Sequence, residues 1–532
     1  ASPAGELIEE QMKMPPVLAL GMLNMWAGRT VLPSLAAMTD DGVAIGISLA
    51  DDQPVFTLVA RGDAQEWREV IELSLTKVAE KMQLPADKIV PPHRQIRGVD
   101  VWLLGDKLSM GLQGGVFLAA GDEATLRRMI DLGAADEPES AGLAGVAGFQ
   151  NARSRERSSD AFAWSWLDLE GLTAGTNAKG LENLRGMVGQ PATQLLLGPV
   201  ISTLTTASEA VIELGLAADG LDLKITGLNV EPGAADAVLL AADARPPRLP
   251  AATEGETARA VLYRDVEAIF RHRVDLFPVE VQPKFAEITS NLSMFFGGED
   301  ITDEVLPGLG PWVGLVAREP RYESGAAPDV PLPAAALLIQ LEESGDMGDR
   351  MVSAFQNLVA ILNITGAQEM RPSMRLRVEN HEGVTFSYAS FRKPAEGEGV
   401  DMRYNLVPAC AVVGDTFILG THISLVRELG GQLARGELES EPAAGESFTL
   451  RGARVAEVLT ANREALVMNA ILNEGKDEAT ASGDVDGLTA IARMIESLRI
   501  ETSRPTTEDL SVRLRITLAA QPAGQPAGQE GK

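Results

Sequence analysis

The sequence of 532 residues has a single cysteine, Cys410, and aromatic residues make up only 5% of it. One thiol cannot close an internal disulfide, so the chain has no disulfide framework. No apolar run reaches the roughly 18 residues that a membrane-spanning helix needs. The longest run, from Val17 to Ala27, is short and is interrupted by Asn24. We therefore expect a soluble chain with no membrane span.

The chain is also poor in basic residues. Lys plus Arg is 46 against 75 Asp plus Glu, which gives a net charge of −29. Binding to nucleic-acid phosphates is driven by Lys and Arg, so this charge argues against a nucleic-acid partner. It argues equally against docking on an anionic membrane surface. The hydrophobic content of 45% is that of a globular protein.

Motifs that mark common catalytic and metal sites are missing. None of the four histidines pairs with another at the spacing of a helical zinc site, and we expect surface or hydrogen-bonded roles for them. They are His93, His272, His381 and His422. Ser48 comes nearest to a nucleophile elbow, but its strand-like surroundings predict an ordinary strand residue. Cys410 has apolar neighbours, which predict a buried and inert thiol.

Glycine-rich and acidic segments are the remaining candidates for ligand sites. Gly308–Gly314 has the glycine spacing of a dinucleotide loop, but it precedes a predicted strand where such a loop would follow one, so we interpret it as a turn. The carboxylates of Gly298–Glu304 and Ser482–Gly487 lack the spacing of an EF-hand, and we interpret both segments as solvated loops. We therefore assign no catalytic, cofactor-binding or metal-ligating residue, and no cofactor.

The sequence does contain short segments that recur in a constant order. Val116–Asp122 is similar to Thr416–His422, and in both cases a β-like run is followed by a turn and a helical segment. The later matches end in two hairpins that alternate apolar and polar residues, the pattern of half-buried antiparallel strands. The further pairs are 161–164 with 447–450, 211–214 with 498–501, 221–225 with 510–514 and, more weakly, 18–20 with 262–264, 43–47 with 311–315 and 56–59 with 337–340.

This order predicts a tandem duplication of one module. Strands and helices mix without regular β-α-β alternation, which favours an α+β fold with mainly antiparallel sheets and packed helices. We expect a first module at 1–245, a proline-rich linker at 246–257, a second and structurally similar module at 258–520, and a disordered tail at 521–532. The tail repeats Gln-Pro-Ala-Gly, a low-complexity pattern.

The recurring pattern carries a resemblance to a protein family. Its residues are Phe117–Asp122, Phe162–Leu172 and Phe417–Thr421. These segments resemble uncharacterised, duplicated secreted proteins of planctomycete-type bacteria, a domain of unknown function. The resemblance implies export and a duplicated α+β fold, and it implies no activity and no functional residues.

Two functional hypotheses follow. The first is a non-catalytic secreted or periplasmic protein that binds a protein or polymer partner in the cell envelope. The small residues of Ala1–Gly5 are typical of a chain from which a signal peptide has been removed. The alternative is a hydrolase of an envelope or extracellular polymer, with a site assembled from dispersed carboxylates or histidines. The oligomeric state is left open.

Overall fold

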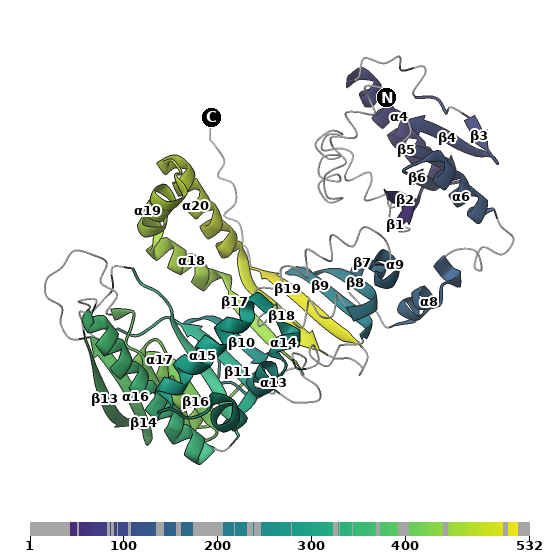
Figure 1. The fold of residues 1–532 in the computed structure, drawn as a ribbon. Coiled ribbons are helices and arrows are strands. Elements are labelled where there is room, and N and C mark those ends of the chain that lie inside the picture. Colours follow the sequence, from purple (N-terminus) through teal and green to yellow (C-terminus); the bar gives the residue numbers. More distant parts are fainter. Residues whose placement is uncertain are drawn as a thin grey trace, which may run out of the picture. The chain divides into compact units, whose positions relative to one another are not determined.

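The computed structural model gives a fold to most of the chain (Figure 1). The residues that it describes are 43–50, 53–81, 86, 90–92, 94–104, 108–134, 143–155, 161–173, 206–217, 219–230, 238, 246–277, 279–322, 328, 330–342, 344–368, 373–391, 404–439, 445–503 and 509–519. They fall into two compact units, and the first unit ends at Arg155.

The first unit is built on one antiparallel sheet of six strands in the order β1-β2-β6-β5-β4-β3. Neighbouring strands pair antiparallel throughout, and Thr57 on β2 faces Ala120 on β6. The elements of this unit are β1 (Val43–Ala50), β2 (Gln53–Arg61), α4 (Ala64–Lys81), β3 (Arg94–Ile96), β4 (Val99–Leu104), β5 (Leu108–Gln113), β6 (Val116–Ala120), α6 (Glu123–Gly133), η1 (Leu143–Gly145) and α8 (Ala147–Ser154).

Each face of this sheet is covered by one helix. Trp67 of α4 packs against Trp102 on one face, and Leu126 of α6 packs against Val101 on the other. Successive strand residues point to opposite faces, so the neighbours Val101 and Trp102 belong to different apolar clusters. The side chain of Asp122 caps α6 by accepting a hydrogen bond from the Thr125 amide at 2.8 Å.

The second unit holds a sheet of thirteen strands in the order β13-β14-β15-β16-β12-β11-β10-β17-β18-β19-β9-β8-β7. Strands β7 to β9 therefore lie beside β18 and β19 from the far end of the chain (Figure 1). The strands are β7 (Ala161–Asp168), β8 (Ala207–Ala217), β9 (Gly220–Val230), β10 (Glu256–Tyr263), β11 (Leu309–Arg318), β12 (Ala334–Leu341), β13 (Met374–His381), β14 (Val384–Phe391), β15 (Ala409–Val413), β16 (Thr416–Gly420), β17 (Ser447–Arg451), β18 (Ile495–Ser503) and β19 (Leu510–Leu518).

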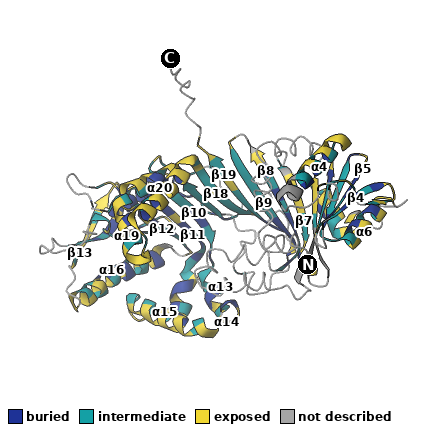
Figure 2. Ribbon diagram, turned by 90° about the horizontal axis from the view of Figure 1, so that it is seen from above, coloured by how far each residue is buried: buried dark blue, intermediate teal, exposed yellow. Residues whose placement is uncertain are grey.

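Helices cover both faces of the β11–β16 part of this sheet. Phe355 of α16 packs against Phe417, and Leu429 of α17 packs against Ile418 on the opposite face. The outer helix faces carry the exposed residues, while the strands between them are mostly intermediate or buried (Figure 2). The helices of this unit are α9 (Leu169–Thr173), α13 (Val266–Arg271), α14 (Arg273–Leu276), η2 (Val279–Val281), α15 (Gln282–Phe295), η3 (Ile301–Val305), η4 (Leu306–Gly308), α16 (Ser344–Gln368), α17 (Ile423–Ala434), α18 (Gly452–Ala461), α19 (Arg463–Glu474) and α20 (Glu478–Met494).

The protein is thus α+β with antiparallel sheets, as the sequence predicts. Two comparisons of strand order stand out. The first sheet, β1-β2-β6-β5-β4-β3, has the same order as β11-β12-β16-β15-β14-β13 in the second. In both, one helix follows the second strand along the chain (α4 after β2, α16 after β12) and another follows the sixth (α6 after β6, α17 after β16). Strands β17-β18-β19-β9-β8-β7 also read alike from both ends when β7–β9 are matched to β17–β19.

The compact units do not coincide with the predicted segments. Strands β7–β9 belong to the sheet of the second unit, because β9 pairs with β19, so the compact units divide near residue 155 and not near 245. The proline-rich segment is not a free linker, since Leu249 is buried in the core and Pro250 forms a bridge with Leu438. The predicted tail at 521–532 lies outside the described residues.

Two smaller predictions have different outcomes. Ser482–Gly487 is not a loop but part of α20, which starts at the Asp477 cap and continues through alanine-rich sequence. Among the helices in the described part of the chain, none is long and apolar enough to cross a membrane.

Candidate functional site

A row of charged residues crosses strands β18, β19, β9 and β8 of the large sheet. Glu501 on β18 faces Arg513 on β19, Arg513 faces Lys224 on β9, and Lys224 faces Glu213 on β8. Residues directly opposite in antiparallel strands share one face of the sheet. The row continues to Ser447 on β17 and Val261 on β10 at one end and to Trp164 on β7 at the other.

Ion pairs fix the charged side chains on this face. Asp222 accepts from Arg513 and, at 3.0 Å, from Arg515, and the Arg513 guanidinium holds the pKa of Asp222 below its usual value. Lys224 Nζ lies 3.2 Å from Glu213 Oε2. Hydrogen bonding to the charged form favours that form, so the Asp222 carboxylate stays ionised around neutral pH.

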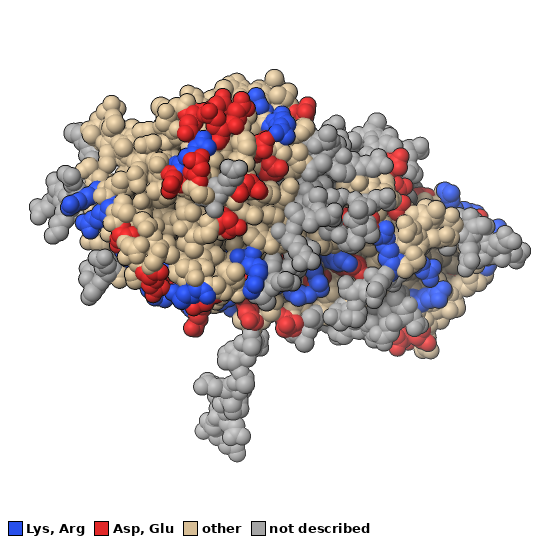
Figure 3. All heavy atoms as spheres, turned by 90° about the horizontal axis from the view of Figure 1, so that it is seen from below, with Lys and Arg blue, Asp and Glu red and all other residues tan. Residues whose placement is uncertain are grey.

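The cationic side chains of the row remain open to solvent. The side chains of Lys224 and Arg513 are 32% and 37% exposed, whereas that of Glu213 is 7% exposed. On the face seen in Figure 3, acidic and basic side chains are likewise interspersed among each other. The row therefore presents positively charged hydrogen-bond donors next to negatively charged acceptors.

Two cavities lie on this face, one on each side of the Lys224–Arg513 pair. The first has a volume of about 280 Å³ and reaches towards β17 and β10, where Pro247, Leu249 and Arg259 contribute to its wall. The second has a volume of about 250 Å³ and reaches the turn between β8 and β9. Both are lined by Lys224 and Arg513, so we call the two cavities together the groove.

The two cavities are lined by corresponding residues. Aligning 221–225 with 510–514, as their sequences suggest, matches Lys224 with Arg513, and the strand registers then match Glu213 with Glu501. Arg513, Lys224 and Glu501 line the first cavity, and their counterparts Lys224, Arg513 and Glu213 line the second. Corresponding residues of the two hairpins thus line the two cavities on either side of the β9–β19 pair.

Glu446 differs from the other carboxylates of the groove. It lines the first cavity, forms an ion pair with Arg264, and accepts a hydrogen bond from the Tyr263 amide at 3.0 Å. Burial nevertheless raises the pKa of Glu446 above its usual value, against the opposing effect of Arg264. A carboxyl group with a raised pKa in a cavity is a candidate acid or base.

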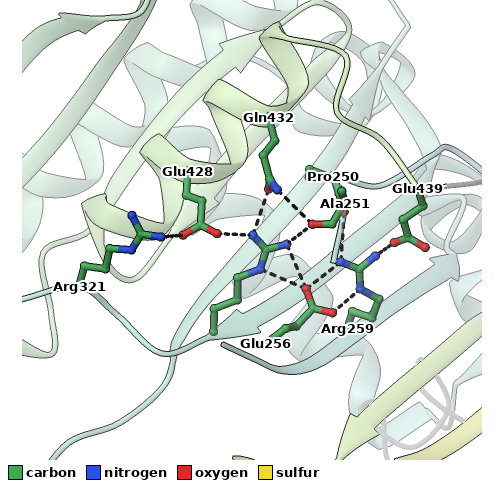
Figure 4. A network of polar contacts seen from close by, with 9 residues as sticks. Pro250, Ala251, Glu256, Arg259, Arg321, Glu428, Gln432 and Glu439 are labelled. Carbon is green, nitrogen blue, oxygen red and sulfur yellow. Dashed lines mark hydrogen bonds and ion pairs between the residues drawn. The ribbon is translucent and has the colours of Figure 1, made fainter. Parts of the chain in front are cut away.

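A buried network of charges adjoins the groove (Figure 4). Arg318 donates to Glu256 Oε2 at 3.1 Å, to Glu428 at 2.7 Å and to the Ala251 carbonyl at 2.9 Å. Arg259 donates to Glu256 as well and also pairs with Glu439, which lines the first cavity. The network therefore ties β10, β11 and α17 to the segment at 250–251 and forms one wall of the groove.

None of the three histidines in the described part of the chain lines either cavity of the groove. His422 caps α17 and contacts Ser424, His272 lies between α13 and α14, His381 ends β13, and His93 lies outside the described residues. The described residues contain no group of three or more His, Cys, Asp or Glu that could hold a metal ion. The predicted role of Ser48 as a strand residue is confirmed by its place in β1.

Other predictions from short motifs are also resolved. Cys410 is fully buried, as predicted, and burial raises the pKa of its thiol to about 12. The prediction of a turn at Gly308–Gly314 is wrong, because only Gly308 belongs to η4 and the rest of the segment lies inside strand β11. In Gly298–Glu304, Asp300 caps η3 and Glu299 pairs with Arg350, so the segment is partly helical and its carboxylates serve the fold.

Sequence reasoning missed the groove, although its signal was present. The matched hairpins 211–214 with 221–225 and 498–501 with 510–514 contain the whole charged row. What the sequence did not reveal is that β9 pairs with β19, which brings the two hairpins into one sheet. Comparisons with protein-family models, with curated proteins and with solved structures gave no match to this chain.

Proposed function

We propose that this protein is a non-catalytic, exported binding protein and that the groove is its binding site. The observation that carries the proposal is the row of paired charges that lines both cavities around Lys224 and Arg513. Each charge already has a partner on the protein, so the row offers fixed hydrogen-bond donors and acceptors to a ligand. An extended polymer that crosses the strands would contact both cavities at once.

Export and duplication are parts of the same proposal. A single buried cysteine suits an oxidising compartment, where a spare thiol is a liability. The shared strand order of β1–β6 and β11–β16 supports two copies of one module, and so does the palindromic order of β7–β9 with β17–β19. The similarity to secreted planctomycete-type proteins stays a prediction.

The test is binding of envelope polymers to the full chain. Insoluble cell-wall material, secreted polysaccharide and envelope protein would be tested in co-sedimentation assays against wild type and a Lys224→Ala/Arg513→Ala double variant. Arg463→Ala is the matched control, because Arg463 is paired with Asp486 and 42% exposed, close to the 37% of Arg513. We expect at least one polymer to bind, with binding lost in the double variant only. Equal binding by all three proteins would refute the groove as the site.

A hydrolase is the second candidate, and Glu446 favours it. Its carboxyl group has a raised pKa and shares the first cavity with the carboxyl groups of Glu439 and Glu501, so more than one carboxyl group lies in one site. Such a pair is what glycoside hydrolysis uses. Release of soluble fragments from the bound polymer by wild type, abolished in Glu446→Gln with binding retained, would replace the binding protein with this enzyme.

A further inference from the structure

The chemistry of the groove narrows the class of ligand. The second cavity is lined by three cationic side chains and three carboxylates, so neither sign prevails there. The cations are Lys224, Arg513 and Arg515, and the carboxylates are Glu213, Asp219 and Asp222. A polyanion would have to displace Asp222 from Arg513, and a polycation would have to displace Lys224 from Glu213. Binding of a charged ligand of either sign therefore breaks one ion pair of the protein for each ion pair that the ligand forms.

Uncharged hydroxyl groups suit this surface better. A hydroxyl both donates and accepts, so it can bridge a guanidinium and the carboxylate beside it without breaking their ion pair. Ser447, Thr502, Ser503 and Ser511 line the first cavity and add hydroxyls of the protein between the charges. Alternating donors and acceptors match a ligand that carries many hydroxyl groups.

The backbone of the sheet favours the same class. Strands β18, β19, β9 and β8 each pair with neighbours on both sides, so the charged row lies on a sheet face, and it reaches the last strand of the sheet, β7, only at Trp164. A peptide that binds by adding a strand needs an open edge. Here only side chains face the ligand, and the amides of a bound peptide would find no regular backbone partners.

Two tryptophan side chains lie on the same face of the sheet, next to the second cavity. Trp164 faces Glu213 across the β7–β8 pair, and Trp166 lies two residues further along the same face, where its Nε1 donates to Glu209 at 2.8 Å. Both side chains are only partly buried. From Glu501 to Trp164 the row covers four strand spacings, about 19 Å. A pyranose ring has an apolar C–H face that packs on an indole and a rim of hydroxyls that reaches the charged row.

We infer that the ligand is a neutral oligosaccharide chain that lies across the strands. One of its sugar rings packs on Trp164, and the hydroxyl groups of its other rings form hydrogen bonds with the row from Glu213 to Glu501. This inference rests on the proposed function, because it names the class of polymer that the groove binds. The sugar ring that packs on Trp164 marks one end of the binding site. The length of the row determines how many sugar units contact the protein and add to the affinity.

The experiment is calorimetric titration of the full chain with β-1,4-linked glucose and N-acetylglucosamine oligomers, from disaccharide to hexasaccharide. We expect affinity to rise with length and then level off, and to change by less than about twofold between low and high salt, because no net charge is exchanged. Trp164→Ala should weaken binding about tenfold, which corresponds to one aromatic stacking contact. Trp164→Phe should recover most of the loss, and Arg463→Ala should match wild type.

Poly-glutamate and poly-lysine are the charged comparison ligands. Binding of either one in preference to the sugars, abolished by high salt and by the Lys224→Ala/Arg513→Ala double variant, would overturn the neutral oligosaccharide while keeping the groove as a binding site. Sugar binding that is unchanged in Trp164→Ala would overturn the orientation and the end of the site. If neither sugars nor charged polymers nor envelope material bind, the proposed function itself fails.

Discussion

The buried network around Arg318 and the open row around Lys224 and Arg513 use the same ion-pair chemistry on the same face of one sheet, with opposite consequences. Arg318 and Glu256 have side chains that are only 2% and 3% exposed, whereas those of Lys224 and Arg513 are about a third exposed. Arg259 belongs to the network and also lines the groove. The transition from one regime to the other thus occurs within one strand, β10.

The difference shows how burial decides what an ion pair does. Two buried charges have lost their water, so removing one leaves the other without compensation, at a high cost. An exposed pair gains little in stability, because water and salt screen it. The network can therefore hold β10, β11 and α17 in place, while the row can exchange contacts with a ligand at little cost to the fold.

The largest effect is expected from breaking the network. Arg318→Ala removes the donor to Glu256, Glu428 and Ala251 and leaves the buried Glu256 carboxylate with Arg259 as its remaining basic partner. Loss of one partner from a buried ion pair costs about 3–5 kcal/mol. Urea unfolding followed by far-UV circular dichroism measures it. Arg463→Ala, which removes an exposed partner, should unfold at nearly the same urea concentration as wild type. Equal effects of the two substitutions would refute the contrast.

An intermediate effect is expected at Glu446, which lies between the two regimes. Its pKa is raised in the folded protein from the ordinary value of 4.5, so the folded state binds the proton more tightly than the unfolded chain. Stability therefore falls as pH rises from about 4.5 through the folded pKa. Glu446→Gln keeps the shape but cannot ionise, so its stability should not fall over this interval.

Thermal unfolding of wild type and Glu446→Gln at closely spaced pH values from 4 upwards measures this difference. Glu501→Gln is the control, because it removes another carboxylate of the same cavity. Parallel stability curves for wild type and Glu446→Gln would show that Glu446 is not the group responsible.

The sequence predicts the fold class better than the division of the chain into compact units. The reason is the distance along the sequence between the residues that are in contact. Apolar and polar residues alternate in 211–214 and 510–514 because one face of each strand is buried. Such a pattern lies within one short segment, so strands and hairpins could be inferred from it. The pairing of β9 with β19 joins residues almost three hundred positions apart, through contacts such as Lys224 with Arg513. No local pattern records such a pairing, which is why the division near residue 155 was missed.

The candidate site was out of reach for a related reason. Motif searches look for nucleophiles, metal ligands and phosphate loops, and the groove consists of common charged residues such as Glu213 and Arg513. Their meaning comes from register, since each faces its partner only when all five strands are aligned. The burial of Cys410 could be predicted because its apolar neighbours are adjacent in sequence.

The smallest effect on stability is expected in the middle of the row, where the comparison is sharpest. Arg513→Ala removes a guanidinium that is held by Asp222 but is 37% exposed. An exposed pair contributes about 0–1 kcal/mol, so the variant should unfold within about 1 kcal/mol of wild type. Asp222 keeps Arg515 as a partner at 3.0 Å, and the carboxylate remains accessible to water, so no buried charge is left alone. Urea unfolding should thus rank Arg318→Ala far below Arg513→Ala, although both substitutions remove an arginine from an ion pair on one sheet. A loss at Arg513 as large as that at Arg318 would mean that the row supports the fold in the same way as the network, and its availability to a ligand would have to be abandoned.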